Sequence, residues 1–171
     1  MSGRPDGARS IDEILASARE RIDRLAPDQA FAQFCAGATI IDIRPAAQRA
    51  EAGEIPGSVV IERNHLEWRL DPASDARLPW ADGYDLRPIV ICNEGYTSSL
   101  AAAALQDLGL LHATDVIGGY QAWRAAGLPT ARPEARAAVL APGAGPAYAV
   151  IESGREVSRC VAEPGASVGR G

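Results

Sequence analysis

The chain has 171 residues, of which 47% are hydrophobic and 23% are charged, an ordinary composition for a globular domain that can bury a core. The formal net charge of −5 argues against a general binding surface for nucleic acid or anionic membranes, because such surfaces need clustered basic residues. The sequence has neither a signal-peptide core near its start nor a run of about 18 apolar residues, so a soluble, cytoplasmic protein without membrane contact is expected.

A helix is predicted first, over residues 11–25. Ser10 and Glu13 have the spacing of a capping box, in which the serine side chain caps the helix and the glutamate reaches back to the serine. Apolar residues then recur at helical spacing as far as Leu25. We assign residues 1–26 to an N-terminal arm that includes this helix.

A second, shorter helix is predicted to begin at Pro27 and to end at Gly37. Its apolar residues share one face with Cys35, so this cysteine is expected to be a small core residue. The three cysteines, Cys35, Cys92 and Cys160, are widely spaced and form no Cys-x-x-Cys pair, which argues against a disulfide framework or a zinc cluster. The two histidines have no ligand-like neighbours, so neither a metal nor another cofactor is expected.

Beyond this helix, short apolar and β-branched runs alternate with helical segments. Strands are predicted at 39–44, 59–61, 89–91 and 114–117, and further helices at 64–70, 100–108 and 120–126. Strands that alternate with helices at short intervals indicate a parallel sheet. The predicted fold class is therefore α/β, an open parallel sheet covered by helices on both faces.

The last part of the chain differs in composition. Residues 133–171 are rich in alanine, glycine and proline and show no sustained period. We expect a mostly disordered tail there, with residues 148–151 as a candidate short strand. Cys160 lies in this tail.

The third predicted strand brings Cys92 to its carboxyl end, where a loop and a helix follow. Ligands of open α/β sheets bind beyond these strand ends, and a loop that leads into a helix N-terminus offers unpaired backbone N–H groups. Gly95 lets the loop curl so that its amides face inward, and the hydroxyls of Thr97, Ser98 and Ser99 are expected to cap the helix or to donate to the site. The position predicts an anion-binding site in which the Cys92 thiolate is favoured as a nucleophile.

Four stretches resemble, in order and spacing, the signatures of the rhodanese-like sulfurtransferase family over about residues 27–130. They are the Asp-x-Arg strand end at 42–44, the turn Gly-Glu-Ile-Pro-Gly-Ser at 53–58, the loop from Cys92 to Thr97, and the closing Gly-Gly-x-x-x-Trp and Gly-Leu-Pro at 118–129. The resemblance implies a single rhodanese-like domain, which we assign to residues 27–132. It also implies that Asp42 and Arg44 are structural residues beside the site.

The resemblance further implies a sulfur-transfer mechanism. Cys92 would attack the sulfane sulfur of a small donor, become a persulfide, and pass that sulfur to a thiol acceptor on a small molecule or on a protein. Backbone amides of the loop would hold the negative charge. The candidate binding residues in the loop are Asn93, Glu94, Gly95, Tyr96, Thr97 and Ser98.

Glu94 departs from the family pattern. Rhodaneses that use thiosulfate well usually carry a basic residue just after the cysteine, whereas this chain has Asn93 and Glu94. A carboxylate there opposes a dianionic donor, so we expect weak thiosulfate activity or a persulfide donor. Arg49, after the first strand, and Arg63, after the second, are candidate compensating cations, and their alternative role is a surface or structural ion pair.

Two other functions stay open at this point. Phosphatases and arsenate reductases of this fold carry an arginine at the end of a Cys-x₅-Arg loop, but that position here is Ser98, which disfavours phosphoryl transfer. Rhodanese-like domains also act as non-catalytic binding modules, and a redox sensor in which Cys160 resolves an oxidised Cys92 is a further alternative. The presence of Cys92 favours catalysis over both.

Overall fold

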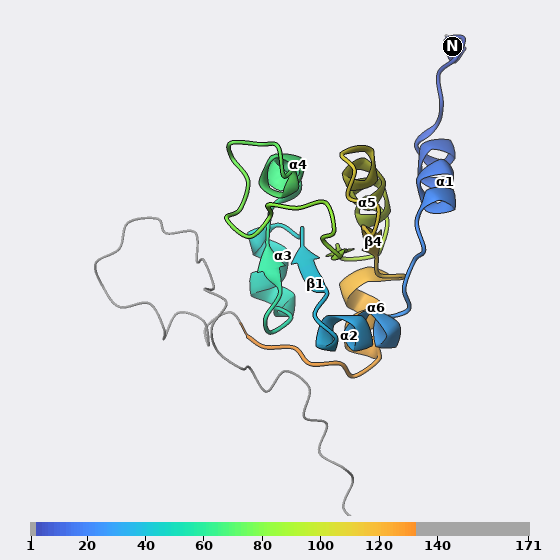
Figure 1. Cartoon of the computed structure of the whole chain (residues 1–171). Helices are drawn as coiled ribbons and strands as arrows, with labels where there is room; N and C mark the ends of the chain where they lie inside the picture. Colours follow the sequence, from blue (N-terminus) through green and yellow to red (C-terminus); the bar gives the residue numbers. More distant parts are fainter. Residues whose placement is uncertain (1–2, 133–171) are drawn as a thin grey trace, which may run out of the picture.

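The computed structural model describes residues 3–132, and their strands form one parallel sheet in the order β2-β1-β3-β4 (Figure 1). The strands are β1 (Thr39–Asp42), β2 (Val59–Val60), β3 (Pro88–Ile91) and β4 (Thr114–Asp115). The register pairs Asp42 with Ile91, so the carboxyl ends of the central strands β1 and β3 lie side by side. The chain leaves β1 toward one edge of the sheet and β3 toward the other, which creates a topological switch point beyond these two ends.

Helices cover both faces of the sheet (Figure 1). They are α1 (Ile11–Arg21), α2 (Pro27–Cys35), α3 (Ala46–Ala52), α4 (Leu66–Leu70), α5 (Thr97–Asp107) and α6 (Gly119–Ala125), and a 3₁₀ turn η1 (Arg63–His65) leads into α4. Apolar residues of α4 and α5 pack with Ile41 and Val90 on one face, and those of α2 and α6 pack with Ile40 and Ile89 on the other. Neighbouring strand residues thus enter opposite cores. The predicted α/β architecture is confirmed.

The helix α1 begins with the predicted capping box. Ser10 Oγ accepts a hydrogen bond from the Glu13 amide at 3.1 Å, and the Glu13 carboxylate accepts one from the Ser10 amide. The helix ends at Arg21, short of the predicted end at residue 25, because Leu25 extends into a β-bridge with Val116 at the edge of the sheet. Since α1 packs against α5, the N-terminal arm touches the helix that follows Cys92.

Other elements differ from their predictions in place or in burial. The helix α3 was not predicted, because none of its seven residues is buried and they form no apolar stripe. The helix α5 already begins at Thr97. Cys35 is exposed, so its predicted place in the core is wrong; Phe34 takes the inward position of α2, and the next residue points about 100° away.

Some predictions cannot be compared with the structure. The tail 133–171, with the candidate strand 148–151 and Cys160, lies outside the described residues, and the domain boundary after residue 26 stays a prediction. Within residues 3–132, no helix combines the length and the apolar character needed to cross a membrane.

Candidate active site

Cys92 directly follows β3, at the switch point of the sheet, and the loop 93–96 connects it to α5. The loop turns sharply at Gly95, whose φ of +77° is rarely adopted by residues with a side chain. A Cβ at this position would also lie 2.8 Å from the Gly118 amide nitrogen. The glycine therefore allows the loop to curl back over the end of β3, close to the turn before α6.

The sulfur of Cys92 is held by backbone donors of this loop. Sγ accepts hydrogen bonds from the Gly95 amide at 3.2 Å and from the Ser98 amide at 3.4 Å. The thiol proton is donated to Ser98 Oγ at 3.2 Å, and the cysteine is only 9% exposed. Two converging N–H groups, at the start of a helix, favour negative charge on this sulfur. Of the predicted loop amides, those of Gly95 and Ser98 thus reach the thiol.

The N-terminal end of α6 fixes the other side of the loop. The Tyr120 amide donates to the Cys92 carbonyl at 2.8 Å, and the Gln121 amide donates to the Asn93 carbonyl at 3.0 Å. Gly119 makes this approach possible, because a Cβ on it would lie 2.5 Å from the Cys92 carbonyl oxygen. The closing signature of the sequence therefore supports the cysteine loop directly.

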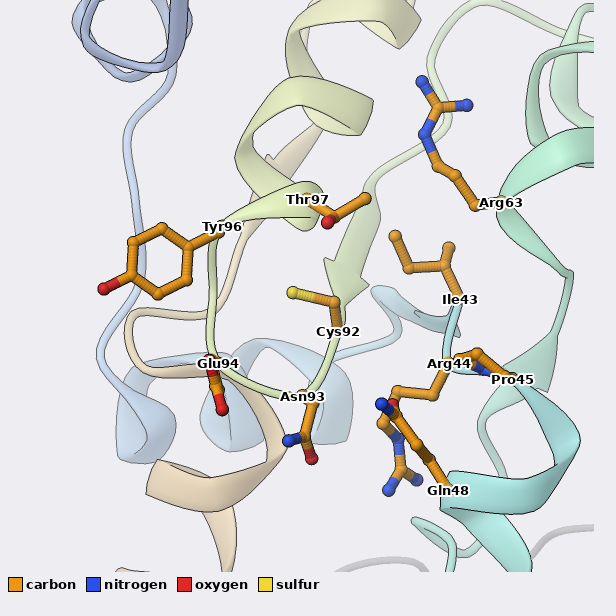
Figure 2. A pocket seen from close by; sticks show the side chains of 10 residues that line it. All are labelled: Ile43, Arg44, Pro45, Gln48, Arg63, Cys92, Asn93, Glu94, Tyr96 and Thr97. Atoms are coloured by element: carbon orange, nitrogen blue, oxygen red, sulfur yellow. The ribbon is translucent and has the colours of Figure 1, made fainter. Parts of the chain in front are cut away.

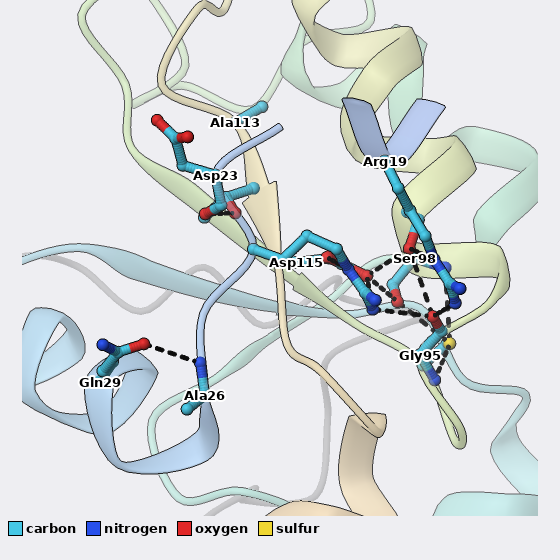
Figure 3. A network of polar contacts seen from close by, with 12 residues as sticks. Arg19, Asp23, Ala26, Gln29, Gly95, Ser98, Ala113 and Asp115 are labelled. Atoms are coloured by element: carbon cyan, nitrogen blue, oxygen red, sulfur yellow. Dashed lines mark hydrogen bonds and ion pairs between the residues drawn. The ribbon is translucent and has the colours of Figure 1, made fainter. Parts of the chain in front are cut away.

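Sequence reasoning missed a buried polar network behind the cysteine (Figure 3). Asp115, at the end of β4, is fully buried and accepts hydrogen bonds from the hydroxyls of Ser98 at 2.9 Å and Ser99 at 2.8 Å. Its carboxylate also pairs with Arg24, Nε–Oδ1 at 2.7 Å and Nη2–Oδ2 at 3.0 Å. The two hydroxyls were expected to cap α5, but they lie in its first turn and no side chain caps that helix. A charged residue in a strand otherwise predicted as apolar was the available signal.

Two arginines of the N-terminal arm hold the loop from behind. Arg19 Nη2 and Arg24 Nη2 donate to the Gly95 carbonyl at 2.9 and 3.0 Å. The Arg19 guanidinium also lies over the Tyr96 ring, 5.3 Å from its centroid, an attractive cation–π contact. Neither arginine was predicted to contact the site, because both precede the stretches that carry the family resemblance.

A cavity of about 390 Å³ opens in front of Cys92 (Figure 2). The thiol lies between the loop and Ile43, with the Arg63 side chain across the cavity, while the Tyr96 ring points away from it. The lining residues are Ile43, Arg44, Pro45, Gln48, Arg63, Cys92, Asn93, Glu94, Tyr96 and Thr97. Of these, Ile43, Pro45 and Gln48 were not predicted, since nothing in their residue types marks them as site residues.

The charges around the cavity are mostly paired. Arg63 Nη1 contacts both carboxylate oxygens of Glu67 at 2.7 and 2.8 Å. Glu94, by contrast, is exposed and accepts one hydrogen bond, from the Gln121 side chain at 3.2 Å. Arg49 is not among the lining residues, since its guanidinium pairs with Glu54 and donates to a backbone carbonyl.

Asp42 and Arg44 form a buried ion pair beside the site. Arg44 Nη2 contacts Asp42 Oδ2 at 2.6 Å and donates to the Gly53 carbonyl at 2.9 Å, and both side chains are 0% exposed. The guanidinium also stacks on Tyr120, 3.6 Å from the ring centroid. These contacts join β1, the turn after α3 and α6, a geometry that suits a structural role. Within residues 3–132, no group of three or more metal-ligating side chains is placed to hold a metal ion.

Comparisons with known proteins show what this chain is similar to in sequence and in fold. A family model described as the rhodanese-like domain matches residues 18–126. The chain is 36% identical over 101 residues to the thiosulfate sulfurtransferase GlpE of Stutzerimonas stutzeri. The matched residues make up 59% of this chain and 84% of that protein. A solved structure from Rhodopseudomonas palustris, of unknown function and described as a possible tyrosine phosphatase, is 34% identical with a TM-score of 0.67 over 75% of this chain and 100% of that chain. The polysulfide-sulfur transferase homodimer of Wolinella succinogenes shares the fold, with a TM-score of 0.57 at 21% identity over 68% of this chain and 83% of that chain.

Proposed function

Because this chain belongs to the rhodanese-like domain family and is a sulfurtransferase of the rhodanese type, we propose that Cys92 is its catalytic residue and carries the transferred sulfur as a persulfide. The observation that carries this proposal is the pair of backbone N–H groups, from Gly95 and Ser98, directed at Cys92 Sγ beside a cavity. Donors fixed by the fold stabilise charge on the sulfur without having to reorganise during the reaction.

The reaction consists of two displacement steps on sulfur. In the first, the Cys92 thiolate attacks the outer sulfur of the donor, a new S–S bond forms, and the donor leaves with the electron pair of its broken bond. The leaving group is sulfite from thiosulfate, or a thiolate from an organic persulfide. In the second step, an acceptor thiolate attacks the outer sulfur of the persulfide, and Cys92 leaves as a thiolate into the same pair of N–H groups.

The charges at the cavity favour an organic persulfide over thiosulfate as the donor. Glu94 is exposed and lines the same cavity as the thiol, and the guanidinium of Arg63 is already paired with Glu67. A dianionic donor therefore meets one unpaired carboxylate and a cation whose charge is largely offset. Ile43 and Pro45 add apolar surface for a carbon-bearing donor. The acceptor is proposed to be a thiol, of a small molecule or of a protein, in the cytoplasm.

Phosphoryl transfer is not proposed, because the loop position that would need an arginine is Ser98. Its hydroxyl is hydrogen-bonded to Asp115 at 2.9 Å, which places a carboxylate behind the loop. A phosphoryl group in transfer needs a bidentate cationic partner at that point, and a carboxylate there opposes its charge.

The test is the intact mass of the purified full chain after incubation with thiosulfate, and separately with cysteine persulfide, each with and without a reductant. We expect cysteine persulfide to add about one sulfur atom, in a form that the reductant removes, and thiosulfate to add less. Cys92→Ser should fold normally and gain nothing, because the remaining side chain cannot form a persulfide.

The outcomes are distinct. A gain that persists in Cys92→Ser would place the sulfur on another residue and contradict the proposal. No gain with either donor would contradict it as well, and would favour the alternative of a binding module that acts with a protein partner. A larger gain with thiosulfate than with cysteine persulfide would refute only the donor preference.

A further inference from the structure

Ser98 and Ser99, the two serines behind Cys92, contact the same carboxylate but differ in their other hydrogen-bond partners. Ser98 and Ser99 are both 0% exposed, and both hydroxyls lie within hydrogen-bond distance of Asp115 Oδ2. Ser98 Oγ also contacts Cys92 Sγ at 3.2 Å, whereas Ser99 Oγ contacts the Gly95 carbonyl at 3.2 Å. Each serine therefore has a second partner in the cysteine loop.

The hydrogens of these groups can be counted for the protonated thiol. A serine hydroxyl has one proton, so it donates one hydrogen bond at a time. When Cys92 is a thiol, it donates to Ser98 Oγ, and Ser98 in turn donates to Asp115. The Ser99 hydroxyl can then donate its hydrogen bond to the Gly95 carbonyl.

The hydrogen bonds that these groups can donate change when Cys92 ionises and releases its proton to the solvent. A thiolate only accepts hydrogen bonds, so the Ser98 oxygen can no longer accept from it, and rotation of the Ser98 hydroxyl turns its proton toward the sulfur. Asp115 Oδ2 still accepts a hydrogen bond from Arg24 Nη2 at 3.0 Å, and it now accepts one from the Ser99 hydroxyl at 2.8 Å. The Gly95 carbonyl keeps Arg19 Nη2 at 2.9 Å and Arg24 Nη2 at 3.0 Å. The Asp115 and Gly95 oxygens therefore keep donors in both states, and only the Ser98 oxygen gives up the hydrogen bond that it accepted from the thiol.

We propose that Ser98 and Ser99 form a hydroxyl switch, anchored by the Arg24–Asp115 ion pair, that adds a third hydrogen bond to Cys92 when it becomes a thiolate. Ser98 is a further catalytic residue, because it contacts the reacting sulfur. Ser99, Asp115 and Arg24 are positioning residues, because their hydrogen bonds keep the buried Asp115 carboxylate supplied with donors in both arrangements. The inference rests on the proposed function in one respect, that Cys92 is the residue whose ionisation serves sulfur transfer.

Other charged groups also face this sulfur, and they set the background against which the switch acts. Behind the loop these are Asp115, Arg24 and Arg19, and on the cavity side they are Glu94, Arg63 and Arg44. A serine-to-alanine substitution changes none of these charges. A difference in Cys92 reactivity between the serine variants therefore reflects lost hydrogen bonds and not a change in the electrostatic field of the charged side chains.

The experiment measures the rate at which iodoacetamide alkylates Cys92 in the full chain from pH 5 to 10, followed by the mass of the peptide that contains Cys92. Alkylation forms an S–C bond from the thiolate and releases iodide, so its rate tracks the ionised fraction. Ser98→Ala should raise the pH midpoint by about one unit, roughly a tenfold loss of rate below the midpoint, because it removes a hydrogen bond to a charged group. Ser99→Ala should raise the midpoint by less.

The matched control is Ser58→Ala, which removes another buried hydroxyl, one that donates to the Ile55 carbonyl at 2.8 Å away from the cavity residues. Its midpoint should equal that of the parent chain. Equal midpoints in all three variants, or a shift from Ser99→Ala as large as from Ser98→Ala, would overturn the switch. Because alkylation needs no sulfur donor, a failure to load persulfide on the parent chain would count against the proposed function and leave this result standing.

Discussion

Glu94 is the single residue that most directly sets the charge met by an incoming donor. Its carboxylate is exposed at the cavity, with the Gln121 amide as a neighbour at 3.2 Å. In the Glu94→Lys variant, attraction replaces repulsion toward thiosulfate, and we expect kcat/KM for thiosulfate to rise about five- to tenfold. Steady-state assays with thiosulfate and with cysteine persulfide measure the effect, which should be small for the persulfide.

The matched control is Glu51→Lys, the same charge change at an exposed position of α3 outside the cavity lining. This variant should leave thiosulfate turnover close to that of the parent chain. An equal rise in both variants would mean that net charge, rather than Glu94, limits the approach of the donor. No rise in either would refute the role of Glu94.

Gly119 determines how closely α6 approaches the cysteine loop. Its φ is +60°, and an added Cβ would meet the Cys92 carbonyl oxygen at 2.5 Å and the Gly95 amide nitrogen at 2.7 Å. Gly127 has a similar φ of +68° with no atom in the way. In Gly127→Ala, the free energy of unfolding in urea should therefore fall by only about 1–2 kcal/mol, the cost of the left-handed conformation.

In Gly119→Ala, the same conformational cost applies, and the added Cβ also displaces the cysteine loop. We expect a larger loss of stability than in Gly127→Ala and a persulfide loading well below that of the parent chain, because Cys92 Sγ moves away from its two N–H donors. Equal stabilities and normal loading in the two variants would show that the loop tolerates the displacement.

The N-terminal arm supplies one partner, Arg24, of the buried ion pair behind the site; the other partner, Asp115, ends β4. Arg24 is 16% exposed and Asp115 is 0% exposed, whereas the pair Arg21–Asp107 is largely exposed. Arg24→Gln leaves the buried carboxylate without its cation, which should lower the free energy of unfolding by about 3 kcal/mol. Arg21→Gln should leave it unchanged within error, because exposed pairs contribute little. Urea unfolding of both variants measures the two changes. Equal losses of unfolding free energy in Arg24→Gln and Arg21→Gln would contradict the role of the buried pair.

The elements that sequence reasoning predicted are those whose signals are local. The capping box of α1 and the apolar runs of the central strands need only neighbouring residues to be recognised. The exposed helix α3 has no apolar stripe, so periodicity does not reveal it. The polar network was missed for a different reason, since Ser98 and Asp115 are 17 residues apart and Arg24 and Asp115 are 91 apart.

The whole molecule positions the cysteine through its topology. Because β1 and β3 are central and their connections diverge, their carboxyl ends leave space for a cavity between Arg44 and Cys92. This position was predictable, since Cys92 follows an apolar strand and precedes a glycine loop. The shape of the cavity and the side of it on which each arginine lies depend on tertiary packing, and they had to come from the structure.

Stability at high pH depends on an unusually small set of groups in this molecule. All 17 lysine and arginine positions are arginine, which stays protonated over the alkaline range, so the tyrosines are the main side chains left to lose a proton there. Tyr120 is the tyrosine most closely tied to the fold: its hydroxyl donates to the Ala52 carbonyl at 2.9 Å, and it is 1% exposed. Any alkaline loss of stability should therefore be traceable to single residues.

Burial raises the pKa of Tyr120 above its ordinary value of 10.0, an effect that the nearby Arg44 charge only partly opposes. The folded chain thus holds the phenol proton more tightly than the unfolded chain, so this contribution is complete below pH 10 and is lost as the pH rises toward the folded-state pKa. We expect the free energy of unfolding in urea to fall as the pH rises above about 10, by roughly 1.4 kcal/mol for each pH unit that separates the two pKa values. Tyr120→Phe should lower stability by about 1 kcal/mol at pH 8, through the lost hydrogen bond, and should flatten the alkaline fall. Tyr84→Phe, at a residue that is 53% exposed, should keep the fall unchanged. A fall that is equally steep in Tyr120→Phe would show that Tyr120 is not its source.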